Sequence, residues 1–191
     1  MQEKYIKIAS IAFNEQLEYM DWYNGLRDNL RNEVLIYTRL NILTQAMNIL
    51  GNAGADLIPV NKLANILAKG IETECNSIKT GLGKSAIDKK LQLIDYMYDV
   101  LGSVASIPSL DKKIASTLKQ ICGNENRRLK KYNVNRLQES DAEDILSSLQ
   151  IIASAYKMAE NLNNSQDAIL KDIQGIYETN VEKYAPYVLN Y

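Results

Sequence analysis

Apolar residues recur every three or four positions along most of the chain. The clearest run lies between 87 and 105, where the steps alternate between four and three residues. Its members are Ile87, Leu91, Ile94, Tyr98, Leu101 and Ala105. This spacing places the apolar side chains on one face of an α-helix, as in the seams of helical bundles. No stretch alternates apolar and polar residues beside an Asn-Gly or Asp-Gly turn, so the pattern predicts no β-strand.

Glycines and prolines divide this pattern into helical segments. The segments span about 3–50, 60–82, 85–105, 109–132 and 140–184. The first carries an apolar stripe made of Ile8, Ala12, Tyr19, Trp22, Leu26, Leu30, Tyr37 and Ile49. It is either one long helix or two helices with a break near Gly25. The glycine does not force a break, because it lowers helix stability by only about 1 kcal/mol relative to alanine. The last segment is likewise either continuous or broken in the polar stretch 161–165.

The ends of the segments carry capping signals. Gly51 is placed to form the left-handed C-cap of the first segment. Ser85, Ser109 and Ser140 precede apolar runs and predict helix starts. Ser140 and Glu143 together form an S-x-x-E capping box, so the start of the last segment is the best marked in the chain.

These patterns predict an all-α fold. At 191 residues the chain is long enough to bury about 70% of its surface in one core. No composition shift or linker separates two halves. We therefore expect residues 1–191 to form a single-domain helical bundle of five to seven helices, with long N- and C-terminal helices and a C-terminal tail at about 185–191.

Composition removes most catalytic chemistry. The chain has no histidine, which excludes a Ser-His-Asp triad, a Cys-His pair and the histidine-containing zinc and di-iron motifs. Two cysteines are too few for a four-cysteine zinc site. The net charge of −1 lacks the basic excess of a nucleic-acid-binding protein. We expect no cofactor, no metal and no nucleic-acid partner. An enzyme is the less favoured alternative, since Asp, Glu, Lys and Tyr chemistry does not need histidine.

One short motif imitates a nucleotide-binding loop. Residues 81–85 read Gly-Leu-Gly-Lys-Ser, like the end of the P-loop pattern G-x-x-x-x-G-K-[ST]. The first glycine of that pattern is replaced by Ile78, and the preceding residues have helical rather than strand spacing. A glycine helix stop followed by the Ser85 cap explains the same residues, so we favour that interpretation.

The basic residues are dense at one place only, between 127 and 136. The group consists of Arg127, Arg128, Lys130, Lys131 and Arg136. A solvated helix end explains such a group, and a contact with a protein partner is the functional alternative.

Two aromatic groups are candidate partner contacts, because Tyr and Trp are favoured interface anchors. One near the N-terminus consists of Tyr19, Trp22 and Tyr23, and one at the C-terminus consists of Tyr184, Tyr187 and Tyr191. The C-terminal group either docks on its own bundle or anchors a neighbouring subunit.

Cys75 and Cys122 both lie on apolar stripes. Two buried free thiols are the favoured interpretation, since a free cysteine behaves as a small hydrophobe. A disulfide between two helices is the alternative, and it would imply an oxidising compartment.

These features favour a non-enzymatic helical protein that associates with itself or with a protein partner. Long helices and few prolines are also typical of helical subunits of secretion or conjugation systems and of virions, so we expect a subunit of a larger assembly. The alternative is a bundle that binds a small apolar or amphipathic ligand. No apolar run is long enough for a transmembrane helix. The chain is cytoplasmic if Met1 is the native start, and exported if Met1 replaces a removed leader.

Overall fold

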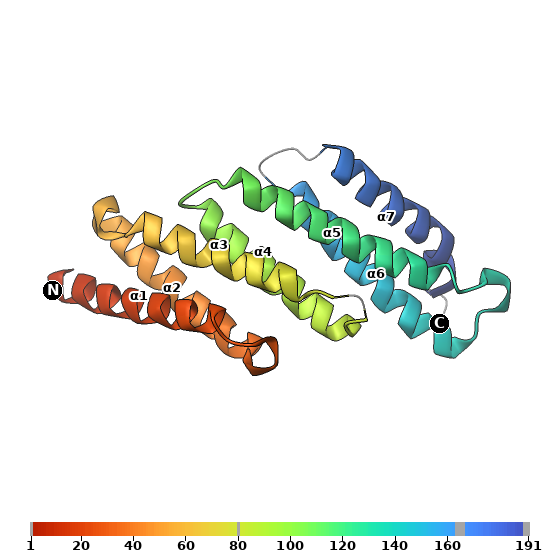
Figure 1. Ribbon diagram of the computed structural model, residues 1–191, viewed down its shortest axis with the longest axis horizontal. Coiled ribbons are helices and arrows are strands. Elements are labelled where there is room, and N and C mark those ends of the chain that lie inside the picture. The colour runs from red at the N-terminus through yellow and green to blue at the C-terminus, as the bar shows by residue number, and fades with distance from the viewer. Residues whose placement is uncertain (1, 80, 163–166, 189–191) are drawn as a thin grey trace. The chain divides into compact units, whose positions relative to one another are not determined.

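The computed structural model describes residues 2–79, 81–162 and 167–188, and within these ranges the chain is all-α. Seven α-helices and no strand are present in the described residues (Figure 1). The all-α prediction is therefore confirmed. None of the described helices combines the length and the apolar character needed to span a membrane.

The chain divides into two compact units. Unit 1 comprises residues 1–77 and 92–106, and unit 2 comprises residues 78–91 and 107–191. The helix α4, Lys84–Gly102, contributes its residues up to Leu91 to unit 2 and those from Gln92 to unit 1. The expectation of a single domain stays a prediction.

Unit 1 contains α1 (Gln2–Asn24), α2 (Glu33–Ala53) and α3 (Val60–Ser77), with the 3-10 turns η1 (Asp28–Leu30) and η2 (Ala55–Leu57). The chain reverses between α1 and α2, so that the two helices lie side by side (Figure 1). The first helical segment is thus two helices. The Asn32 side chain begins the second of them by accepting a hydrogen bond from the Leu35 backbone N–H.

A glycine permits close packing inside unit 1. A Cβ atom on Gly70 would lie 3.0 Å from both Asn24 Oδ1 and Met97 Sδ. Asn24 is buried there and donates to the Ile66 carbonyl at 2.9 Å, which ties the end of α1 to α3. Any larger residue at position 70 must push α1 or α4 away.

Unit 2 contains α5 (Pro108–Leu129), α6 (Glu139–Glu160) and α7 (Asp167–Val188), with the 3-10 turn η3 (Val134–Arg136) before α6. These three helices pack against one another. The core of the unit is aliphatic and includes Ile114, Leu118, Ile121, Ile145, Ile152 and Ile173, all almost fully buried. Each such side chain contributes about 1.5–3 kcal/mol when it leaves water.

Several predicted helix starts are wrong by one to two residues. The N-cap of α5 is Ile107, and Pro108 takes the first helical position, so Ser109 lies inside the first turn. The helix α6 begins at Glu139, because the Asp141 carboxylate accepts a hydrogen bond from the Gln138 backbone N–H at 3.0 Å. Proline and aspartate therefore supply the start signals that the sequence pattern assigned to serines.

The predicted glycine stops are also partly wrong. Gly51 lies inside α2, since packing of the apolar faces outweighs the small helix penalty of glycine. The C-cap of α2 is Gly54. The helix α3 already ends at Ser77, before Gly81, and α4 begins at Lys84, so Ser85 lies inside its first turn.

Candidate functional site

The basic cluster of residues 127–136 lies on the last turn of α5, on the turn that follows it and, with Arg136, on η3. Arg127 and Arg128 occupy the last turn of the helix, where the negative end of the helix dipole favours cations. Arg127, Lys130, Lys131 and Arg136 are exposed, and Arg128 is half-buried. The cluster therefore presents most of its charge to solvent.

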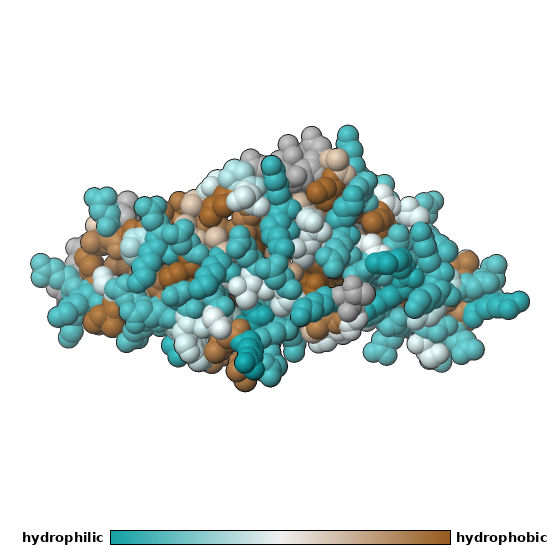
Figure 2. All heavy atoms as spheres, viewed as in Figure 1, coloured by the Kyte–Doolittle hydropathy of each residue, from teal (hydrophilic) through white to brown (hydrophobic). Residues whose placement is uncertain are grey.

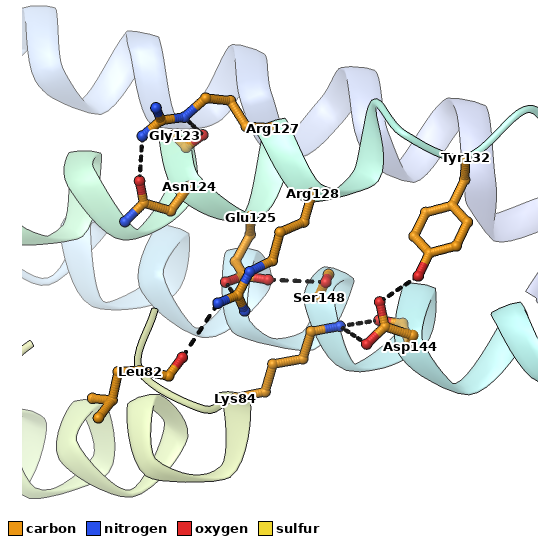
Figure 3. A network of polar contacts seen from close by, with 10 residues as sticks. All are labelled: Leu82, Lys84, Gly123, Asn124, Glu125, Arg127, Arg128, Tyr132, Asp144 and Ser148. Atoms are coloured by element: carbon orange, nitrogen blue, oxygen red, sulfur yellow. Dashed lines mark hydrogen bonds and ion pairs between the residues drawn. The ribbon is translucent and has the colours of Figure 1, made fainter. Parts of the chain in front are cut away.

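Arg128 is held in place by a network of polar contacts (Figure 3). Its guanidinium donates to Glu125 Oε1 at 2.8 Å and to the Leu82 carbonyl at 3.3 Å. The Glu125 side chain is fully buried, and its second oxygen accepts from the Ser148 hydroxyl of α6 at 2.9 Å. The network links α5 to α6 and to the loop before α4.

Arg127 makes only neutral contacts. Its side chain turns back along α5 and donates to the Asn124 side-chain oxygen and to the Gly123 carbonyl (Figure 3). Within the described ranges no carboxylate forms an ion pair with Arg127. Its positive charge is thus oriented without being neutralised.

Lys84, Asp144 and Tyr132 form a second polar group. Lys84 Nζ lies 2.6 Å from Asp144 Oδ1 and also donates to the Asp144 backbone carbonyl. The Tyr132 hydroxyl donates to Asp144 Oδ2 at 2.6 Å (Figure 3). Partial burial of Asp144 opposes ionisation, but the hydrogen bonds from Lys84 and Tyr132 outweigh it and lower the pKa of the carboxyl. The hydrogen bond to Asp144 raises the pKa of Tyr132 to about 12.

This geometry excludes a P-loop at residues 81–85. The residues before the loop form the helix α3 instead of a strand, and Lys84 is directed to Asp144. The sequence did not reveal this partner, because Lys84 and Asp144 lie 60 residues apart. The polar group therefore fastens the start of α4 to α6.

Two shallow hollows flank the basic cluster. One, of about 280 Å³, is lined by Gly81, Asn124, Arg127, Arg128 and Lys131. The other, of about 510 Å³, is lined by Gly83, Lys84, Arg128, Lys131, Tyr132 and Asp144. Arg128 and Lys131 border both, so the two hollows adjoin.

A third hollow, of about 480 Å³, lies beside the start of α4 and the middle of α6. It is lined by Lys84, Ser85, Asp88, Ser147, Gln150, Ile151 and Ser154. Six of these seven side chains are polar. In the part of the chain that the structure describes, no three cysteine, aspartate or glutamate side chains gather to hold a metal ion.

The C-terminal aromatic residues differ in how far they are buried. Tyr184 is almost fully buried, and its hydroxyl donates to the Leu129 carbonyl at 2.5 Å. This favours docking of Tyr184 on its own unit. Tyr187 is exposed on α7, which continues through Pro186 to Val188. Tyr191 lies outside the described residues, as do the last positions of the predicted tail.

The N-terminal aromatic group is divided in the same way. Tyr23 is buried in unit 1, whereas Trp22 is 58% exposed. The Tyr19 ring lies between them in burial, packs against Trp22 with ring centroids 5.3 Å apart, and carries the Arg39 guanidinium over its face. Trp22 and Tyr19 are therefore the members that remain open to a partner.

Exposed apolar side chains are concentrated in unit 1. Of the large ones in the described ranges, all but Leu146 and Tyr187 lie between residues 5 and 60. They are Tyr5, Ile8, Ile11, Trp22, Leu30, Val34, Leu35, Ile42, Ile49, Leu57 and Val60. Figure 2 shows apolar side chains at the surface beside α1. The predicted stripe of the first segment, which includes Ile8, Trp22, Leu30 and Ile49, has no buried member, and of these four only Trp22 is a predicted partner contact. The core face of α1 instead carries Phe13, Leu17 and Met20.

The cysteines are both free and buried, as favoured from the sequence. Cys122 lies on α5 next to the polar network. Burial, reinforced by the negative charge of Glu125, raises the pKa of its thiol to about 12. The thiol is therefore a packing group with little nucleophilic character.

Fold and geometry define an all-α protein with an exposed apolar surface in unit 1 and a basic cluster beside shallow hollows in unit 2. Comparisons with known proteins find no matching family, no similar curated sequence and no similar solved structure.

Proposed function

We propose that this chain is a non-enzymatic helical interaction protein, a subunit that packs on a protein partner through the outer surface of α1 and α2. The observation that supports the proposal is the concentration of exposed apolar side chains between residues 5 and 60. Scattered exposed apolar residues are normal on any protein, but a contiguous group marks a contact site.

The spacing of these residues makes a helix–helix contact geometrically suitable. Leu35, Ile42 and Ile49 lie seven residues apart on α2, and each is exposed by more than a third. Residues at this interval repeat on one face of a helix, as in the seam between paired helices. The stripe is thus arranged to receive a second helix along its length.

The helix α1 extends the same surface. Tyr5 lines a shallow hollow of about 230 Å³ together with Ile49 and Ala53 of α2. Ile8 and Ile11 follow Tyr5 at three-residue steps and are more than half exposed. The start of α1 therefore continues the apolar stripe of α2.

The charge of the chain is compatible with self-association. A net charge of −1 produces little long-range repulsion between copies. A second copy is therefore the first partner to test, followed by a different helical protein.

Size-exclusion chromatography with light scattering on the full chain tests the proposal. We expect a discrete oligomer, and we expect Ile49→Lys to shift it to monomer because a buried interface lysine is strongly unfavourable. Asn48→Lys is the matched control, since Asn48 is the exposed neighbour on the same helix. Circular dichroism confirms that each variant folds.

The proposal would be contradicted by a chain that stays monomeric up to high concentration and that does not bind a fluorescent dye specific for exposed apolar surface. Equal loss of assembly in both lysine variants would also count against the stripe, since charge alone would then explain the effect. Tyr187→Ala measures the separate contribution of α7 without removing the buried Tyr184.

A further inference from the structure

We propose that the hollow lined by Gly81, Asn124, Arg127, Arg128 and Lys131 binds a phosphate group. This goes beyond the interaction role, because it concerns unit 2 and a small anion. The first argument is the composition of the lining. Three cations border a space of about 280 Å³, and none of the described residues that line it is a carboxylate. The potential in such a concave cationic site favours an anion.

The charges around the hollow are incompletely neutralised. Glu125 pairs with Arg128, but its carboxylate is buried and also accepts from Ser148. Among the described residues, Arg127 donates only to neutral oxygens of Asn124 and Gly123. In the described part of the chain, Lys131 has no carboxylate partner either. Two positive charges therefore remain, which matches the charge of a phosphate dianion.

The cations are also positioned in advance. The contacts with Glu125 and the Leu82 carbonyl fix the Arg128 guanidinium, and Asn124 fixes that of Arg127 (Figure 3). An anion then binds without a large loss of side-chain entropy. Guanidinium groups suit phosphate because their planar forks donate two parallel hydrogen bonds.

Gly81 keeps one side of the hollow open. Its φ angle of 92° lies in the left-handed region, where residues with a side chain are strained. Apart from its two chain neighbours, no described residue has an atom within 4 Å of the position that its Cβ would occupy, so the space beside it is open.

The adjoining hollow offers room for the rest of an organic phosphate. It shares Arg128 and Lys131 with the first hollow and adds the polar groups of Lys84, Tyr132 and Asp144. Lys84 and Tyr132 already form hydrogen bonds with Asp144, so we place the phosphate itself in the first hollow, beside the three cations.

Nuclear magnetic resonance titration of the full chain with inorganic phosphate tests the site. Sodium chloride at matched ionic strength is the reference, since added salt screens exposed charges. We expect phosphate to shift the backbone amide signals of Gly81, Asn124 and Lys131. A parallel titration with adenosine monophosphate distinguishes the source: tighter binding supports an organic phosphate that also uses the adjoining hollow, and equal binding supports recognition of the phosphate alone.

Arg127→Gln and Lys131→Gln are the test variants, because both side chains are exposed and their removal leaves the core intact. We expect each to weaken phosphate binding by about fivefold. Lys130→Gln is the matched control, since Lys130 is exposed in the same turn and does not line the hollow. Absence of shifts at these amides, or equal weakening by the Lys130 variant, would overturn the proposal.

Discussion

The Arg31 guanidinium lies 2.9 Å from the Glu74 carboxylate, and both side chains are almost fully buried in unit 1. Arg31 also pairs with Asp28 at 2.7 Å, and the Ser77 hydroxyl donates to the Glu74 carboxylate at 3.3 Å. The pair therefore connects the turn after α1 to the end of α3. It fixes where the chain reverses before α2.

Breaking this pair should be strongly destabilising. Arg31→Met leaves the Glu74 charge buried without its cation, which costs about 3–5 kcal/mol of unfolding free energy. Glu74→Leu should cost less, because Arg31 keeps its ion pair with Asp28. Urea denaturation followed by circular dichroism measures both effects. The double variant Arg31→Met/Glu74→Leu should recover most of the loss, because neither charge remains to be desolvated.

If the double variant did not recover the lost unfolding free energy, the ion pair would contribute net stability beyond the cost of leaving one buried charge unpaired. A loss below about 1 kcal/mol in Arg31→Met would contradict the buried pairing, since that is the range of exposed ion pairs. The exposed pair of Lys69 and Asp21, at 3.2 Å, provides the comparison in the same unit.

Glu125 should be the most sensitive carboxylate of unit 2. It is fully buried and bonds both Arg128 and the Ser148 hydroxyl. Glu125→Ala removes the acceptor of both donors and should cost about 2–3 kcal/mol of unfolding free energy, because the Arg128 cation that remains is only half-buried. Ser148→Ala removes one donor and should cost about 1–3 kcal/mol. Chemical denaturation measures both.

Glu143→Ala is the matched control for Glu125, because Glu143 is exposed on α6. Its effect should stay within about 0.5 kcal/mol. Equal effects of the two glutamate substitutions would show that the buried network does not contribute to stability.

The helices themselves could be predicted from the sequence, because the spacing of apolar residues reports the period of the backbone. Their ends could not be placed as well. The N-cap of α6 is Gln138, whose backbone N–H donates to Asp141, and the N-cap of α5 is Ile107, although a serine lies two residues further along in each case. Several residues near each end can supply a cap, and tertiary packing decides which one does.

The apolar surface of α1 shows where periodicity fails. The helix carries one apolar face in the core, with Phe13, Leu17 and Met20, and further apolar residues on its outer side, with Ile8 and Trp22. Spacing alone cannot say which face is covered. The answer depends on where α2 and α3 pack, which involves residues distant in sequence.

Part of the candidate site could be predicted and part could not. The density of positive charge between 127 and 136 is a local property, so the sequence revealed it. The contact of Lys84 with Asp144 and of Arg128 with the Leu82 carbonyl joins residues 60 and 46 positions apart. Only the fold brings these groups together.

Tyr132 should make stability depend on pH at both ends of the range. Its hydroxyl donates to the Asp144 carboxylate, which raises the pKa of Tyr132 from 10.0 to about 12. The contribution is fully present below pH 10 and is lost as Tyr132 ionises between pH 10 and 12. The pKa of Asp144 is lowered by folding, so its contribution is present above pH 3.8 and is lost as the pH falls below that value.

The wild-type chain should therefore exceed Tyr132→Phe in unfolding free energy by a constant amount between about pH 5 and 9. Solvent screening limits this amount to about 1 kcal/mol. Denaturation at a series of pH values measures the difference, which should shrink toward both extremes. Tyr5→Phe, at an exposed tyrosine of unit 1, is the control. A difference that does not change with pH would contradict the bond to Asp144.

Cys122 should resist modification while the chain is folded. The side chain is fully buried, and burial together with the charge of Glu125 raises the pKa of its thiol to about 12. At pH 8 about one thiol in ten thousand is then ionised, and the thiolate is the reactive form. Iodoacetamide labelling followed by mass spectrometry should show almost no modification of native Cys122 and complete modification in guanidinium. Ser154→Cys places a thiol at an exposed position of α6 in the same molecule and should label quickly under native conditions. Equal labelling rates at the two positions would show that α5 opens far more often than the packing of its core implies.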